Sequence, residues 1–309
     1  MISIQIRPIL LQFITFKHSI KILFLFFILL LAFACKEPSY QHPGYDDPRD
    51  APVRPIAPDR RLAPKVNIVR NPEPFPWYKG IDVIPSFAIK SRVWAPTPVG
   101  RSWDIVNFAL ATVHRIEENQ VILRAGELEF TVPTAVLLPA RISKNLARGT
   151  PVVAAIGLTG EWAKVVENTD QSVVVQLVFA QEVVTRTLTP DAVLPLDGKG
   201  PGSPVGILRQ NKTVGFGMLV YIDHDTAGVI GYAGRFEQVP TQSIRFVSLN
   251  TRLKKNTSMF APYTDRLEEV RILDVLENGV AANVLFVSRP EETGINPRVV
   301  SYARLTPMW

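Results

Sequence analysis

Short runs of β-branched residues separated by polar turns constrain the fold of this chain more than any other feature. Four such runs follow one another: PVVAAIG (151–157), AKVVE (163–167), SVVVQLVF (172–179) and EVVTRTLT (182–189). Valine, isoleucine and threonine favour strands, and short regular spacing of strands is typical of small barrels or sandwiches. Helical patterns are confined to short candidates at 140–148 and 263–269. We therefore expect an all-β fold after residue 78.

The strand-rich part repeats itself with a period of roughly 55 residues, which predicts four modules. Each module opens with an apolar strand, continues through a central hairpin and closes with a Val/Leu-rich strand. AVLLP (135–139) and AVLPL (192–196) are the most similar closing strands. The last hairpin contains Asn278-Gly279, a pair that favours a type I′ turn. The predicted modules are residues 79–146, 147–199, 200–252 and 253–309.

This order of segments resembles a tandem of SH3-like barrels, closest to Tudor or agenet modules, over residues 80–309. GEWAKVV (160–166) is similar to the hydrophobic second strand of those families, although Ala163 directly follows Trp162 here. The resemblance implies small SH3-like barrels. It does not supply a function, because one fold serves many functions.

An apolar segment precedes the only cysteine of the chain. Residues 22–34, ILFLFFILLLAFA, are uncharged, and they end at Cys35. Arg7, Lys17 and Lys21 lie before the run, and no acidic residue does. The run is shorter than the roughly 20 residues that span a bilayer. A basic start, a short apolar run and small residues at its end are typical of an export signal.

This segment resembles a bacterial lipoprotein signal. The resemblance implies a signal peptide over residues 1–34, cleavage before Cys35, and acylation of that cysteine by membrane lipid. Ala34 matches the small residue before the cut, whereas Ala32 stands where the family usually has leucine. Lys36, in place of aspartate, favours the outer membrane over the inner one. Two alternatives stay open: an uncleaved signal anchor, and ordinary cleavage that leaves an unmodified thiol.

A proline-rich stretch links this signal to the modules. Ten of the residues 36–78 are proline, which removes backbone donors and disfavours helices and central strands. We expect residues 35–78 to form an extended, disordered tether that holds the modules away from a membrane. A proline-rich ligand for aromatic grooves is the alternative.

The charge balance gives no support to nucleic acid as a partner. The formal net charge is +6, and removal of residues 1–34 takes away three basic residues and no acid, leaving +3. Such a small excess of positive charge does not indicate the basic surface that is typical of nucleic-acid-binding proteins.

No pattern in the sequence predicts a catalytic residue, a metal or a cofactor. Asp223-His224-Asp225 stands alone, without further ligands at zinc-like spacing. GPGSPVG (200–206) lacks the lysine and helix of a phosphate loop. Glu117-Glu118, Glu268-Glu269 and Glu291-Glu292 are adjacent pairs, and neighbouring residues of a strand face opposite sides.

Aromatic residues gather in the third module and form the candidate ligand-binding cluster Phe216, Tyr221, Tyr232 and Phe236. Rings can surround a cation, a peptide or a sugar, or can simply fill a small core. Trp94, Trp103 and Phe108 form a similar group in the first module.

The sequence thus predicts a membrane-anchored protein of the bacterial cell envelope that is not an enzyme. Strand edges and grooves between modules would bind a protein or peptide partner. The competing prediction is an exported envelope enzyme, such as a cell-wall hydrolase, with a site between modules.

Overall fold

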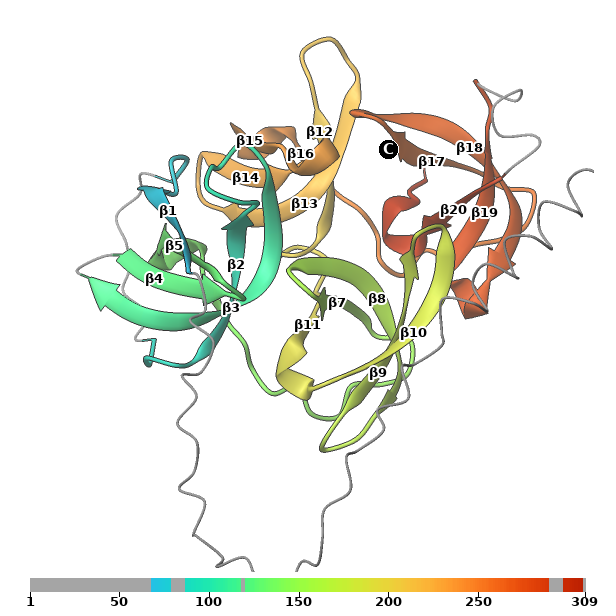
Figure 1. Cartoon of the computed structure of the whole chain (residues 1–309). Coiled ribbons are helices and arrows are strands. Elements are labelled where there is room, and N and C mark those ends of the chain that lie inside the picture. Colours follow the sequence, from blue (N-terminus) through green and yellow to red (C-terminus); the bar gives the residue numbers. More distant parts are fainter. Residues whose placement is uncertain (1–67, 79–86, 118–119, 289–296, 308–309) are drawn as a thin grey trace, which may run out of the picture. The chain divides into compact units, whose positions relative to one another are not determined.

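The computed structural model describes residues 68–78, 87–117, 120–288 and 297–307, all within one compact unit formed by residues 64–309. These residues form strands joined by turns and short 3₁₀ helices (Figure 1), which confirms the expected all-β class. The helical candidates were wrong: 140–148 is mostly irregular, and 263–269 turns from one strand into the next. None of the helices in these ranges has the length and apolarity needed to cross a bilayer. Residues 1–34, Cys35 and most of the tether lie outside the described residues.

The first sheet has six strands in the order β1-β5-β4-β3-β2-β6. They are β1 (Val69–Pro74), β2 (Arg92–Pro98), β3 (Val106–Glu117), β4 (Gln120–Ala125), β5 (Leu128–Pro133) and β6 (Leu138–Pro139), with the 3₁₀ helix η1 (Thr134–Val136) before β6.

The second sheet has the order β10-β9-β8-β7-β11. Its elements are β7 (Pro151–Ile156), β8 (Thr159–Asn168), β9 (Val173–Phe179), β10 (Glu182–Leu188), η2 (Pro190–Ala192) and β11 (Val193–Pro195).

The third sheet has the order β15-β14-β13-β12-β16. Its elements are β12 (Pro204–Leu208), β13 (Val214–Ile222), β14 (Thr226–Ile230), η3 (Tyr232–Gly234), β15 (Phe236–Pro240), η4 (Thr241–Ser243) and β16 (Ile244–Phe246).

The fourth sheet has the order β17-β18-β19-β20. Its elements are β17 (Ser258–Tyr263), β18 (Arg266–Leu276), η5 (Glu277–Gly279), β19 (Ala281–Phe286), β20 (Arg298–Ser301) and η6 (Tyr302–Arg304). A bridge from Thr306 to Phe260 stands where the other sheets have a fifth strand.

Every sheet draws its strands from one predicted module, except that β1 comes from the predicted tether. β1 pairs in parallel with β5, so the tether boundary at residue 78 is too late. Prolines are tolerated in β1 because it is an edge strand. The buried carboxylate of Glu129 on β5 holds this edge through Arg70, at 3.3 Å, and also pairs with Arg124 at 3.2 Å.

The same tight turn leads into the first strand of every module. Its third residue has positive φ and its fourth is serine or threonine. The four turns are 88–91, 147–150, 200–203 and 254–257, with positive φ at Lys90 (71°), Gly149 (86°), Gly202 (87°) and Asn256 (63°). In each turn the fourth residue donates its N–H to the carbonyl of the first.

The second strand of every module has a β-bulge where this turn meets it. The register shifts at Val113/Arg115, Val165/Glu167, Leu219/Tyr221 and Ile272/Asp274. The residue before each bulge exchanges two backbone hydrogen bonds with the turn. In the second module the Gly149 N–H donates to the Val165 carbonyl at 2.7 Å, and the Val165 N–H donates to Thr150 at 3.0 Å. A bulge bends its strand and increases the twist.

The modules also share a core. One hydrophobic cluster includes buried rings from every sheet: Trp94, Trp162, Phe216 and Phe286. The second and third modules each add a smaller core of their own. Tyr302 of the fourth module donates its hydroxyl to the Ala163 carbonyl of the second, at 2.9 Å. The modules are therefore packed against one another within this unit.

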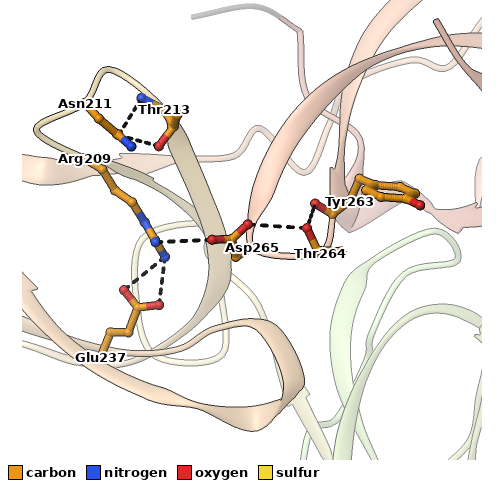
Figure 2. A network of polar contacts seen from close by, with 7 residues as sticks. All are labelled: Arg209, Asn211, Thr213, Glu237, Tyr263, Thr264 and Asp265. Atoms are coloured by element: carbon orange, nitrogen blue, oxygen red, sulfur yellow. Dashed lines mark hydrogen bonds and ion pairs between the residues drawn. The ribbon is translucent and has the colours of Figure 1, made fainter. Parts of the chain in front are cut away.

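A polar network joins the third and fourth modules (Figure 2). Arg209, at the end of β12, donates to both carboxylate oxygens of Glu237 at 2.9 and 3.3 Å and lies 3.7 Å from the carboxylate of Asp265. Asn211 accepts from the backbone and hydroxyl of Thr213 and shapes the neighbouring loop. Arg209 therefore has two acidic partners, one from each module.

The repeated turn allows a direct test. No atom lies within 4 Å of the position of a Cβ added to Gly149. We expect Gly149→Ala to lower the free energy of unfolding by about 1 kcal/mol through backbone strain alone. Lys90→Gly, at the equivalent position, should leave stability unchanged or raise it by up to about 1 kcal/mol. Urea denaturation measures both, with Arg148→Ala as a neighbouring control. If Gly149→Ala and Lys90→Gly changed the free energy of unfolding in the same direction and by the same amount, the two turns would not be equivalent.

Candidate functional site

The structure does not bring the four predicted aromatic residues into one cage. Phe236 stacks on Trp77 with ring centroids 4.4 Å apart, and Tyr221 lies edge-on to Tyr78 at 5.2 Å. The end of the predicted tether therefore covers these two rings. Phe216 is also buried, whereas Tyr232 is 53% exposed.

Phe216 and Tyr232 instead line a cavity of about 460 Å³. A neighbouring cavity of about 320 Å³ lies beside the hairpin of β9 and β10. Both cavities are lined by residues of the second and fourth modules: Glu161, Trp162, Pro262, Arg298 and Arg304. We call the two cavities together the arginine groove. Trp94, Trp103 and Phe108, the aromatic group of the first module, are buried in the core.

Strand β8 supplies one wall of the groove. Trp162 is held by a hydrogen bond from its Nε1 to the Gly202 carbonyl, at 2.8 Å, and by edge contact with Phe216 at 5.7 Å. Gly160 precedes Glu161 and Trp162 on β8. A Cβ added to Gly160 would lie 2.5 Å from the carbonyl oxygen of Phe108. Glycine is thus required where β8 crosses β3, and this crossing sets the position of Glu161 and Trp162.

The two arginines lie against aromatic rings. The Cζ of Arg298 is 4.9 Å from the ring centroid of Tyr263, and the Cζ of Arg304 is 5.5 Å from the ring of Trp162. Within the described part of the chain, neither guanidinium has an ion-pair or hydrogen-bond partner. Both residues have exposed surface, and loss of hydration lowers the pKa of the Arg304 guanidinium, while the charge of Glu161 acts in the opposite direction. Such arginines offer their N–H donors to a bound anion.

Glu161 is the acidic residue in the lining of both cavities. Loss of hydration raises its pKa above the ordinary value, while the positive charge of Arg304 acts in the opposite direction. The groove therefore holds two guanidinium groups and a carboxyl group that keeps its proton to higher pH than an exposed one.

A strained turn closes the smaller cavity. Ala180 and Gln181 form the two-residue connection between β9 and β10, with φ of 49° and 66°. Positive φ at both positions defines a type I′ turn, which normally uses asparagine or glycine. The side-chain oxygen of Gln181 accepts a hydrogen bond from the backbone N–H of Val299, at 3.1 Å. The expected type I′ turn at Asn278-Gly279 is instead part of η5, where Glu277 also has positive φ.

The other sequence patterns that we examined lie elsewhere. His224 is in an exposed turn, where its Nδ1 lies 2.8 Å from the carboxylate of the neighbouring Asp225. In the described ranges, no group of three or more His, Cys, Asp or Glu residues has the arrangement of a metal site. Glu268 is buried and Glu269 exposed, as expected for neighbours on a strand. Glu118, Glu291 and Glu292 lie outside the described residues.

Sequence reasoning named Phe216 and Tyr232 of the arginine groove but missed its charged residues and Trp162. Arg298 and Arg304 flank the apolar segment VVSYA, and nothing local distinguishes them from surface arginines. Glu161 and Trp162 lie in the quoted GEWAKVV motif, which we interpreted only as a strand. Charged residues within or next to otherwise apolar strand segments are the signal that could have identified these positions.

The raised pKa of Glu161 predicts a pH-dependent stability. A carboxyl group with a higher pKa in the folded state binds its proton more tightly there, so stability falls as the pH rises from about 4.5 through the folded-state pKa. We expect Glu161→Gln to raise the melting temperature at pH 7 and to have little effect at pH 4. Glu167→Gln, an exposed exchange on the same strand, is the control. A stabilisation that is equal at both pH values would contradict this account.

No protein-family model and no curated protein sequence matches the chain.

Proposed function

We propose that the chain is a lipid-anchored protein of the bacterial cell envelope that binds a protein or peptide partner in the arginine groove and is not an enzyme. The observation that carries the binding role is the pair of arginines, Arg298 and Arg304, that form no ion pair within the described residues. Exposed aromatic surface beside charged donors is typical of sites that bind polypeptides.

The modules are proposed to be SH3-like barrels. Three features support this: the fifth strand pairs with the first, a 3₁₀ helix precedes it, and the second strand is bulged. The sheet order β10-β9-β8-β7-β11 corresponds to fourth, third, second, first and fifth strand of the second module. Small modules of this kind serve many functions, and binding is the one that the arginine groove supports.

The anchor is proposed from the sequence. Cys35, the basic start and the apolar run at 22–34 support export and acylation. Two or more acyl chains hold a protein firmly on a membrane, whereas one chain gives only marginal binding. Lys36 after the cysteine supports the outer membrane as the location.

The groove supports binding better than hydrolysis. A glycoside hydrolase of the usual kind needs two carboxyl groups about 5 to 9.5 Å apart. The described lining of the arginine groove supplies one, Glu161. Two arginines that stay charged are poor general acids or bases but good anion ligands.

Labelling of cells with radioactive palmitate tests the anchor. We expect the wild-type chain to take up the label and Cys35→Ala to take up none, because the thiol and the new amino terminus would both be lost as acylation sites. Lys36→Ala is the matched control and should remain labelled. Equal labelling of wild type and Cys35→Ala, or a purified chain that still contains residues 1–34, would show that the anchor is wrong.

A further inference from the structure

We infer that the arginine groove binds an extended peptide segment that carries a carboxylate, pairs with the edge of β20 and places the carboxylate between Arg298 and Arg304. This inference rests on the proposed binding function and names the class of ligand. It is argued from the edge of β20, the position of Gln181 and the charges of the groove.

Among the residues that the structure describes, strand β20 is the last strand of its sheet and pairs with β19 on one side only. Its other side faces the β9–β10 hairpin (Figure 1), and there the Val299 N–H is directed away from β19 to the Gln181 side chain. An edge strand with outward N–H groups is the template to which an extended peptide adds.

Gln181 occupies the place of a peptide group from an added strand. Its amide oxygen is the same kind of acceptor as a backbone carbonyl, and it accepts from Val299 at 3.1 Å. Gln181 is exposed and sits in a turn whose φ values are unfavourable for alanine and glutamine. Strain of this kind tends to be retained where it serves a site. A ligand carbonyl can replace the side chain at little cost, because one hydrogen bond is exchanged for another.

The charges of the groove select an acidic ligand. Arg298 and Arg304 line both cavities, and the nearby Glu161 carries at most one negative charge against their two positive charges. An arginine binds a carboxylate through two parallel N–H donors, which gives direction as well as strength. A peptide paired with β20 would run past both side chains, since Arg298 begins β20 and Arg304 follows it in η6.

The smaller cavity also offers contacts for the side chains of a peptide. Phe179 is 50% exposed at its rim, although it is a large apolar residue. Ser301 of β20 also lines this cavity, and its buried hydroxyl has no hydrogen-bond partner among the described residues. Unpaired buried hydroxyls are uncommon, so a ligand group that reaches Ser301 would satisfy a polar atom that is otherwise unpaired.

Peptide capture by the full mature chain in detergent micelles tests the inference. The probes are two synthetic libraries of random octapeptides, one with a fixed central glutamate and one with glutamine there. We expect the immobilised wild-type chain to retain the glutamate library about tenfold better, as measured by mass spectrometry. The double variant Arg298→Gln/Arg304→Gln should lose this preference. Lys254→Gln/Lys255→Gln removes the same charge from exposed positions of the same module and should keep it.

Gln181→Asn tests the strand pairing. Asparagine tolerates positive φ, and its shorter side chain should not reach Val299, so a peptide would find the edge of β20 free. We expect this variant to retain several times more glutamate peptide than the wild type. A captured peptide, added to the wild type, should slow hydrogen exchange in residues 298–301.

The outcomes separate the inference from the proposed function. Equal retention of both libraries, or a preference that survives in the arginine variant, overturns the role of the carboxylate. The double variant Arg298→Lys/Arg304→Lys keeps both positive charges. Its melting temperature, compared with that of the wild type, shows whether replacement of the two arginines disturbs the fold. Unchanged exchange in residues 298–301 overturns the strand pairing. If no peptide is retained, the inference fails, and envelope extract passed over the same matrix then decides the proposed function: it survives if a protein is specifically retained and fails if none is.

Discussion

Backbone hydrogen bonds between the entry turn and the bulged second strand determine the shape of every module. The turn needs one residue with positive φ, and the residue before the bulge is bonded to it on both of its backbone groups, as Val165 is to Gly149 and Thr150. The bend at the bulge lets the second strand pair with the first strand of its module along one part of its length and with the third strand along another. Everything that the modules do together depends on the direction that this bend gives to the second strand.

Strand β8 shows this dependence most clearly. Just before its bulge, successive residues contact different modules: Trp162 donates to Gly202 of the third, the Ala163 carbonyl accepts from Tyr302, and Lys164 donates to the Gly279 carbonyl of the fourth. The Gly160 crossing brings the first module against the same strand. The arginine groove lies beside β8 because this strand, the second of its module, contacts the other modules there.

Two groups of charged residues elsewhere in the unit form ion pairs, unlike the arginines of the groove. Glu129 is buried among Arg70, Arg124 and His114, and Arg209 lies between two carboxylates (Figure 2). Such pairs fit a structural role, since a buried carboxylate without a partner is costly. Arg298 and Arg304 have aromatic neighbours but form no ion pair in the described residues, and Glu161 acts on Arg304 only through its charge. Exposed donors of this kind stabilise the fold little and remain available to a ligand.

The amino-acid sequence by itself determined the strand-rich class and the fourfold rhythm, because alternation and turn preference act over a few residues. It did not reveal the entry turns, since lysine, glycine and asparagine share the positive-φ position and only hydrogen bonding makes them equivalent. Only the tertiary structure decided that Tyr221 and Phe236 are covered by Trp77 and Tyr78, and that the type I′ turn is Ala180-Gln181. It also decided that Arg298 and Arg304 line the same cavities as Glu161 and Trp162. The physical reason is distance along the chain: the Tyr302–Ala163 and Lys164–Gly279 hydrogen bonds join residues 139 and 115 positions apart, and no local pattern encodes which distant surfaces will pack together.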